Sequence, residues 1–177
     1  AHSLSRNNAE EIVESQIDNS NVDLFCGALD GICTVRKSMI KDNGYEYCEN
    51  IAIVEDEDKA AELLRSYIEE YEKKNNQKYE VHRFRNGVDF LDNYKSTYAV
   101  VFMDIQMPYM DGYYATHTIR MLSDEAISNI PIIAMTANAF EGDVKKSLEA
   151  GMNGHLSKPI DIKKMYVLLD RFLNSEE

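Results

Sequence analysis

From residue 50 onward, five short β-rich runs alternate with amphipathic stretches, and this alternation constrains the fold more than any other feature of the sequence. Repeated strand–helix alternation predicts a parallel sheet with helices on both faces. Nearly continuous apolar runs predict central strands that are covered on both sides. The predicted strands are IAIV (51–54), YEVHRF (79–84), AVVFM (99–103), PIIAM (131–135) and GHLS (154–157).

The stretches between and after these runs carry apolar residues at helical spacing, which predicts helices with one buried face. We expect three such faces to pack on the sheet. They consist of Ala61, Leu64, Ile68 and Tyr71, then Phe140, Val144 and Leu148, and finally Ile162, Met165, Tyr166 and Leu169.

The first 49 residues differ in character from the rest of the chain. They are polar and irregular, and they contain too few apolar residues to form a core alone. We therefore predict an N-terminal extension or linker over residues 1–49, partly helical or disordered, and one folded domain over residues 50–177.

Composition excludes several classes of protein. The net charge of −12 argues against direct binding of nucleic acid, which requires a clustered basic surface. No apolar run approaches the roughly 20 residues of a membrane span, and the N-terminus lacks a signal pattern, so we expect a cytoplasmic protein. Cys26, Cys33 and Cys48 are odd in number and show no CxxC spacing, which favours free thiols over disulfides or zinc.

Polar side chains gather where the predicted strands end, and in parallel sheets ligands bind at that edge, where the strand order reverses. Carboxylates brought close together there need a cation or a proton to offset their charge. A hard divalent ion such as Mg²⁺ suits oxygen ligands of this kind. The residues are Glu55, Asp56 and Glu57 after the first strand, Asp104 after the third, Thr136 after the fourth, and Lys158 and Pro159 after the fifth.

This set of residues also suits phosphoryl transfer. Lys158 would supply a second positive centre for an incoming phosphoryl group. Thr136 offers a hydroxyl that could donate to a phosphoryl oxygen. An ionised Asp104 between metal and lysine is a plausible nucleophile, since carboxylates can form acyl phosphates.

Four separated motifs carry a resemblance to a known family. VEDED (54–58), MDIQMPYMDG (103–112), MTAN (135–138) and HLSKPI (155–160) resemble, in order and spacing, the receiver domain of two-component response regulators. The resemblance covers about residues 50–175. It implies the CheY-like, flavodoxin-like fold: a three-layer (βα)5 α/β domain with a doubly wound, parallel, five-stranded sheet in the order 2-1-3-4-5.

The resemblance also implies roles for individual residues. Asp104 would be the phosphoacceptor, and Glu55 and Asp56 the acid pair that binds Mg²⁺, with Mn²⁺ as an alternative. The backbone carbonyl of Gln106 would be a further metal ligand. Thr136 would be the switch hydroxyl and Lys158 the lysine that contacts the phosphate. The remaining matched positions are the Lys158–Pro159 bond, expected to be cis, and the switch and tuning residues His155, Ala137, Asn138 and Gln106.

As a receiver, the chain would take its phosphoryl group from a histidine kinase or a histidine-phosphotransfer domain. It would catalyse this transfer and its own dephosphorylation, and would signal to a downstream protein through the family's helix 4, strand 5 and helix 5. Residues 130–160 look like receivers of hybrid histidine kinases, whereas residues 51–84 look more like receivers that precede LytTR-type DNA-binding domains. Because only SEE follows the last predicted helix, we favour the hybrid-kinase parent over a truncated LytTR regulator.

Other interpretations of the same residues are available. Glu55, Asp56 and Glu57 could be an acidic first turn on a helix dipole, and Thr136 could be a helix cap. A phosphatase of the haloacid-dehalogenase type uses similar side chains, but it needs an aspartate where this chain has Gln106. A receiver that only binds proteins would not need the complete set of acids, threonine and lysine.

Overall fold

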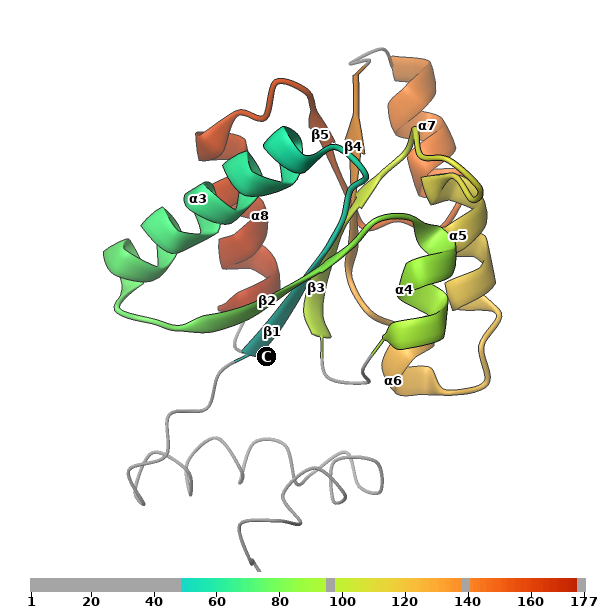
Figure 1. Ribbon diagram of the computed structural model, residues 1–177, viewed down its shortest axis with the longest axis horizontal. Coiled ribbons are helices and arrows are strands. Elements are labelled where there is room, and N and C mark those ends of the chain that lie inside the picture. The colour runs from blue at the N-terminus through green and yellow to red at the C-terminus, as the bar shows by residue number, and fades with distance from the viewer. Residues whose placement is uncertain (1–48, 95–97, 138–140, 175–177) are drawn as a thin grey trace, which may run out of the picture. The chain divides into compact units, whose positions relative to one another are not determined.

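The computed structural model describes residues 49–94, 98–137 and 141–174 (Figure 1). Its five strands form one sheet in the order β2-β1-β3-β4-β5, and all neighbouring strands are parallel. This confirms the predicted fold and strand order. The strands are β1 (Glu49–Val54), β2 (Tyr79–Phe84), β3 (Tyr98–Asp104), β4 (Ile132–Thr136) and β5 (Gly154–Ser157).

Helices cover both faces of the sheet. Figure 1 shows α3 and α8 on one face and α4, α5 and α7 on the other, so the domain has three layers. The described helices are α3 (Asp58–Asn75), α4 (Gly87–Asn93), α5 (Gly112–Arg120), α6 (Glu125–Ser128), α7 (Glu141–Glu149) and α8 (Ile162–Leu173). None of these helices is long and apolar enough to cross a membrane.

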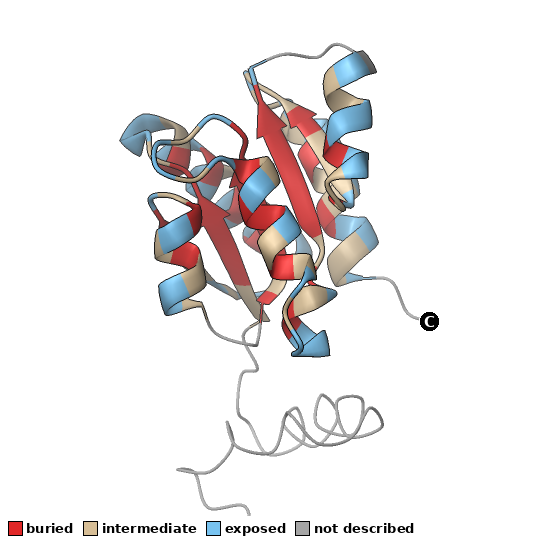
Figure 2. Ribbon diagram, turned by 90° about the vertical axis from the view of Figure 1, so that its right-hand side faces the viewer, coloured by how far each residue is buried: buried red, intermediate tan, exposed pale blue. Residues whose placement is uncertain are grey.

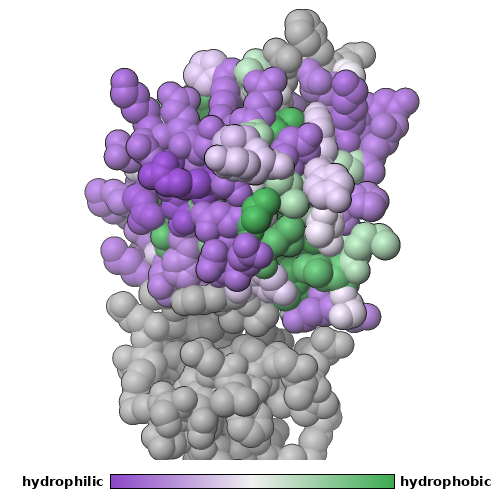
Figure 3. All heavy atoms as spheres, turned by 45° about the vertical axis from the view of Figure 1, so that its right-hand side comes forward, coloured by the Kyte–Doolittle hydropathy of each residue, from purple (hydrophilic) through white to green (hydrophobic). Residues whose placement is uncertain are grey.

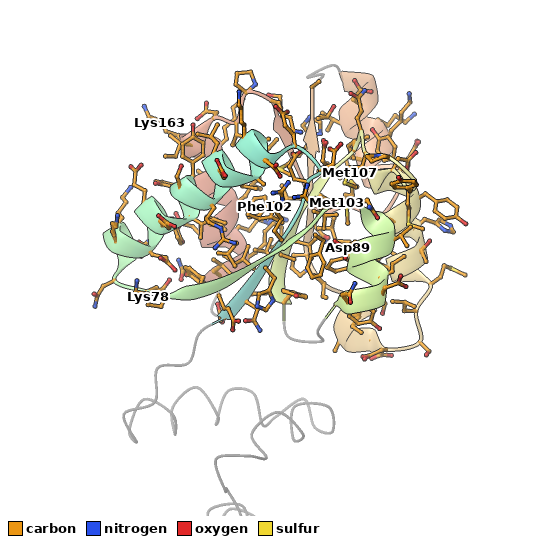
Figure 4. All side chains as sticks on the ribbon, viewed as in Figure 1. Lys78, Asp89, Phe102, Met103, Met107 and Lys163 are labelled. Carbon is orange, nitrogen blue, oxygen red and sulfur yellow. The ribbon has the colours of Figure 1, made fainter. Side chains whose placement is uncertain are left out.

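The strands alternate their side chains between two cores, one on each face. Phe102 packs with the helices α3 and α8, whereas its neighbour Met103 packs with α4 and α5 (Figure 4). This alternation follows from the two-residue period of a strand. It explains why the central strands are apolar throughout, and Figure 2 shows them buried between helices whose outer sides are exposed. The surface seen in Figure 3 is mostly hydrophilic.

β1, β3 and β4 differ from the predicted strands by one or two residues at their ends, whereas β2 and β5 have the predicted bounds. β4 begins at Ile132 rather than Pro131, because proline has no N–H to give to a ladder, although the Pro131 carbonyl still accepts a hydrogen bond from Val101. Asp104 and Thr136 are the last residues of β3 and β4 instead of the residues that follow them. Both polar side chains therefore stand on the sheet itself, which holds them more rigidly than a loop would.

Two of the three predicted helix faces can be compared in full. Ala61, Leu64, Ile68 and Tyr71 are buried on α3, as predicted. On α8, Met165 and Leu169 are buried while Ile162 and Tyr166 are half-buried, so that face is confirmed as well.

The predicted face of α7 is wrong at Leu148. This side chain is 60% exposed, whereas Ser147 is 1% exposed and turned inward. The Ser147 hydroxyl donates to the backbone carbonyl of Asp143 at 2.9 Å, so its burial leaves no unsatisfied polar group. A small residue that satisfies its hydroxyl within its own helix can thus replace an apolar one against the sheet. Phe140 lies outside the described residues, as do Cys26, Cys33, Cys48 and residues 1–48 of the predicted extension.

Candidate functional site

The carboxyl ends of the strands bring the predicted acids and the lysine to one edge of the sheet. The sheet order reverses between β1 and β3, because the chain passes from β1 outward to β2 and then returns to the other side of β1. Glu55 follows β1 and Asp104 ends β3, so the two acids flank this switch point. Lys158 follows β5 and reaches the same place across β4.

Lys158 bridges the two buried acids. Its Nζ lies 2.7 Å from Oε2 of Glu55 and 3.1 Å from Oδ2 of Asp104. The lysine side chain is 26% exposed, whereas both carboxylates are buried. The backbone N–H of Lys158 also donates to the carbonyl of Thr136 at 2.7 Å, which ties the lysine to the end of β4. The Lys158–Pro159 bond is cis, as predicted.

Burial dominates the electrostatics of this site. It raises the pKa of the Glu55 and Asp104 carboxyls, and the nearby charge of Lys158 offsets this effect only in part. Burial lowers the pKa of Lys158, but its hydrogen bond to Glu55 and the charge of Asp104 outweigh burial and raise it. The lysine is therefore protonated at neutral pH. Its single positive charge does not fully offset the burial of the two acids.

Three carboxylates converge here closely enough to share one cation. Glu55, Asp56 and Asp104 each offer an oxygen, and these oxygens lie within 4.8 Å of one another. Three carboxylates with one lysine carry a net charge of about −2 when all are ionised, which a divalent cation would neutralise. Mg²⁺ binds well to a small number of carboxylates and retains waters or phosphate oxygens in its other positions. The residues present thus fit the predicted metal.

The loop after β3 packs tightly against the strand end. A Cβ at Gly112 would lie 2.3 Å from the backbone oxygen of Asp104, and the Gly112 N–H donates to the carbonyl of Ile105 at 3.1 Å. Asp111 caps α5 by accepting a hydrogen bond from the Tyr114 N–H at 2.7 Å. The close approach holds the start of α5 against the phosphoacceptor candidate.

Two exposed residues, Gln106 and Tyr109, lie in this loop. Gln106 is exposed, and the backbone N–H groups of Ile105 and Gln106 lower the pKa of Asp104, although by less than burial raises it. Tyr109 is 92% exposed and has a φ of +66°, an unusual value for a residue with a large side chain. The carbonyl of Gln106 as a metal ligand stays a prediction.

The predicted switch residues lie along β4 and β5. Thr136 is buried at the end of β4, and Ala137 beside it is exposed. His155 lies on β5; among the described residues neither of its ring nitrogens has a hydrogen-bond partner, and burial lowers the pKa of the ring. Asn138 lies outside the described residues.

Sequence reasoning missed Arg83, which lies on the edge strand β2. Its guanidinium donates to the backbone carbonyl of Glu55 through Nε at 3.2 Å and Nη2 at 3.1 Å, and Nη2 donates to the carbonyl of Asp56 at 3.1 Å. Nη1 contacts Oδ1 of Asp58 at 2.7 Å. A single arginine in a strand carries no motif, so only its contacts reveal that it holds the acid loop, which consists of Glu55, Asp56 and Glu57.

The family model of the response regulator receiver domain matches residues 51–170. The chain belongs to this receiver family. The match confirms the predicted resemblance and favours a receiver over a phosphatase of the haloacid-dehalogenase type.

Relatives of this receiver include both kinases and a stand-alone regulator. It is 50% identical to Histidine kinase 1 of Arabidopsis thaliana over 70 residues, which are 40% of this chain and 6% of the kinase. It is 38% identical to Hybrid signal transduction histidine kinase I of Dictyostelium discoideum over 89 residues, or 49% of this chain and 5% of that protein. It is 31% identical to the Polar-differentiation response regulator DivK of Brucella ovis over 126 residues, which cover 71% of this chain and 96% of DivK. The receiver therefore spans a small part of the kinases it matches.

Solved structures agree with this assignment. The receiver domain of the sensor histidine kinase PA1611 from Pseudomonas aeruginosa is 30% identical, with a TM-score of 0.62 over 73% of this chain and 100% of that one. That structure has a magnesium ion coordinated in its active-site cleft. A chemotaxis protein, CheY4 of Vibrio cholerae, shares the fold at 18% identity, with a TM-score of 0.58 over 71% of this chain and 99% of that one.

Proposed function

We propose that this receiver accepts a phosphoryl group from a phosphohistidine onto Asp104. The donor would be a histidine kinase or a histidine-phosphotransfer domain. One observation carries the proposal: Asp104 stands at the end of a buried central strand with an ammonium 3.1 Å from its Oδ2 and two further carboxylates nearby. Lys158 offsets part of the cost of burying the Asp104 carboxylate, at the place where a phosphoryl group would bring further negative charge.

The transfer needs one bond to form and one to break. An oxygen of Asp104 attacks phosphorus, the bond between phosphorus and the donor imidazole nitrogen breaks, and its electron pair returns to that nitrogen. The ammonium of Lys158 would stabilise the negative charge that develops on the phosphoryl oxygens during the transfer. Mg²⁺ held by Glu55, Asp56 and Asp104, with the carbonyl of Gln106, would neutralise charge on the same oxygens; Mn²⁺ offers the same ligand preference.

Phosphorylation would then act as a switch. The added charge would draw the hydroxyl of Thr136 and shift the population toward a second arrangement, in which His155 moves with it. The surface that changes would be the one formed by α7, β5 and α8, which we propose as the contact with a downstream protein. Gln106, Ala137 and Asn138 would tune the lifetime of the acyl phosphate.

The parent protein that we propose is a hybrid histidine kinase acting in the cytoplasm. The kinase relatives support this parent, and a truncated LytTR-type regulator is the alternative. The acidic net charge supports protein partners rather than nucleic acid. Residues 1–49 would link the receiver of residues 50–177 to the preceding part of the protein.

Incubation with acetyl phosphate and Mg²⁺ tests the proposal. Intact-mass spectrometry should detect the gain of one phosphoryl group in the parent chain and none in Asp104→Asn. Asp92→Asn is the matched control, because Asp92 is exposed on α4 and lies outside the acid cluster. Labelling that persists in Asp104→Asn, or that never appears in the parent chain, contradicts the mechanism. Steady phosphate release from many phosphomonoesters would instead favour a phosphatase.

A further inference from the structure

The peptide bond between Asp56 and Glu57 is held at both ends. Its carbonyl oxygen, on Asp56, accepts a hydrogen bond from Nη2 of Arg83 at 3.1 Å. Its N–H, on Glu57, donates to Oε1 of Glu55 at 3.2 Å. The carbonyl and N–H of one peptide bond point in opposite directions, so these two contacts fix the orientation of the peptide plane. The torsions on either side of this peptide, ψ of Asp56 and φ of Glu57, are restricted as a result.

Arg83 reaches this peptide from the neighbouring strand. It lies opposite Ile53 in the register of β1 and β2, and the ladder continues past the strand end through a bond from the Glu55 N–H to the carbonyl of Phe84 at 2.9 Å. From there the guanidinium spans the two carbonyls of Glu55 and Asp56 and the carboxylate of Asp58. A planar fork of five donors can make these contacts together, whereas a single ammonium cannot.

The side chain of Asp56 depends on this support more than its neighbours do. Lys158 holds the carboxylates of Glu55 and Asp104 directly. Across the part of the chain that the structure describes, no hydrogen bond or ion pair holds the carboxylate of Asp56. Its direction therefore follows from the backbone of its loop.

We propose that Arg83 is a positioning residue for the divalent cation of this site. By clamping the carbonyls of Glu55 and Asp56, it aims the Asp56 carboxylate at the point shared with Glu55 and Asp104. This inference rests on the proposed function, because it assumes that the site binds Mg²⁺. It goes beyond that function because it makes the Mg²⁺ affinity of the site depend on Arg83, which contacts the backbone of the ligand loop and would not contact the metal or the phosphoryl group.

Electrostatics and positioning predict opposite signs for removal of Arg83. If the guanidinium acted only through its charge, its loss would make the site more negative and would strengthen Mg²⁺ binding. If it positions the loop, its loss releases Asp56 and weakens binding. Residues that orient metal ligands in this way typically contribute about 10- to 100-fold to affinity. The sign of the change therefore separates the two explanations.

The test is calorimetric titration of the full chain with Mg²⁺. Arg83→Gln should bind Mg²⁺ about tenfold more weakly than the parent chain. Arg85→Gln is the matched control, because Arg85 also contacts Oδ1 of Asp58, at 3.2 Å, but donates to neither carbonyl of the acid loop. Asp58→Asn removes the ion pairs of Asp58 with Arg83 and Arg85 and leaves the carbonyls of Glu55 and Asp56 available to Arg83. Both control variants should bind Mg²⁺ like the parent chain.

Hydrogen exchange at the Glu57 amide gives a second readout without metal. Exchange should be faster in Arg83→Gln than in the parent chain and unchanged in Arg85→Gln. Arg83→Lys restores one contact at most, so its affinity should be intermediate; it also decides the question if Arg83→Gln does not fold.

The inference is overturned if Arg83→Gln binds Mg²⁺ as tightly as the parent chain or more tightly, or if Arg85→Gln weakens binding equally. That outcome says nothing against labelling of Asp104 or against Mg²⁺ binding by the parent chain, so the proposed function survives it. Failure of the parent chain itself to bind Mg²⁺ overturns both.

Discussion

The ammonium of Lys158 lies 2.7 Å from a carboxylate oxygen of Glu55, although 103 positions separate the two residues in the chain. The contact joins the loop after the first strand to the loop after the last one across the edge of the sheet. Glu55 is almost completely buried, so its charge depends on this partner. The pair therefore couples the stability of the domain to the chemistry of the site.

Replacing Lys158 with methionine should destabilise the metal-free receiver by roughly 2–3 kcal/mol, because two buried carboxylates lose their cation. Urea unfolding at neutral pH, followed by circular dichroism, measures this change. Lys163→Met is the matched control, since Lys163 is an exposed lysine on α8 and makes no ion pair among the described residues. An equal loss in both variants would show that the Lys158 contacts contribute nothing specific. Labelling of Asp104 should also slow in Lys158→Met.

The phosphoacceptor candidate should itself be a source of instability. Burial raises the folded-state pKa of Asp104 above its ordinary value of 3.8. Asp104 therefore favours the folded state only while its carboxyl is protonated. This stabilisation is complete below the ordinary pKa and is lost as pH rises through the folded-state pKa. At neutral pH the metal-free protein carries that cost in full, so Asp104→Asn should be more stable by about 0.5–2 kcal/mol.

Unfolding free energies at pH 7 and pH 4 check this expectation. The advantage of Asp104→Asn should shrink toward pH 4, where the parent chain regains the contribution of Asp104. Asp92→Asn should show no such dependence. A metal-free Asp104→Asn that is less stable than the parent at pH 7 would contradict the electrostatic account of the site.

Mg²⁺ should raise the stability of the parent chain in a concentration-dependent way. A ligand that binds only the folded state stabilises it by about 2.7 kcal/mol at 100 times its dissociation constant. Thermal unfolding with increasing Mg²⁺, reversed by a chelator, measures the effect. The shift should be much smaller in Asp56→Asn, which removes one of the three converging carboxylates. Equal shifts in both proteins would place the ion elsewhere.

The sheet and the composition of its edge could be predicted because both follow from local patterns. Apolar runs such as AVVFM determine a buried strand, and parallel strands must end at a common edge. Asp104 and Lys158 could therefore be assigned to one place without coordinates. The motifs around them added the family, which the comparison with the receiver model confirms.

Two kinds of contact could not be predicted: those that depend on the rotation of a helix about its axis, and those that depend on how far a long side chain extends. The inward turn of Ser147 and the exposure of Leu148 depend on the rotation of α7, and apolar spacing did not determine it because a serine can satisfy its hydroxyl within the helix. Arg83 contacts backbone carbonyls, which every residue has, so no residue type marks its partners in advance. Register and side-chain reach are needed to find such a contact.

The close packing of Gly112 provides the last prediction. A methyl group there would lie 2.3 Å from the backbone oxygen of Asp104 and 3.0 Å from Cα of Ile105, and neither backbone atom can move without shifting the strand end. Gly112→Ala should therefore destabilise the domain by about 1–3 kcal/mol. It should also slow labelling of Asp104, because the displaced strand end carries the phosphoacceptor. Chemical unfolding and intact-mass labelling measure the two effects.

Gly142→Ala is the matched control for this substitution. A Cβ at Gly142 meets no atom of the described residues within 4 Å, and the residue lies in α7, where alanine is favoured over glycine by up to about 1 kcal/mol. This variant should be slightly more stable than the parent chain and should be labelled normally. If Gly112→Ala is as stable as Gly142→Ala, the start of α5 can move away from β3 at little cost. The tight contact would then not be what holds Asp104 in place.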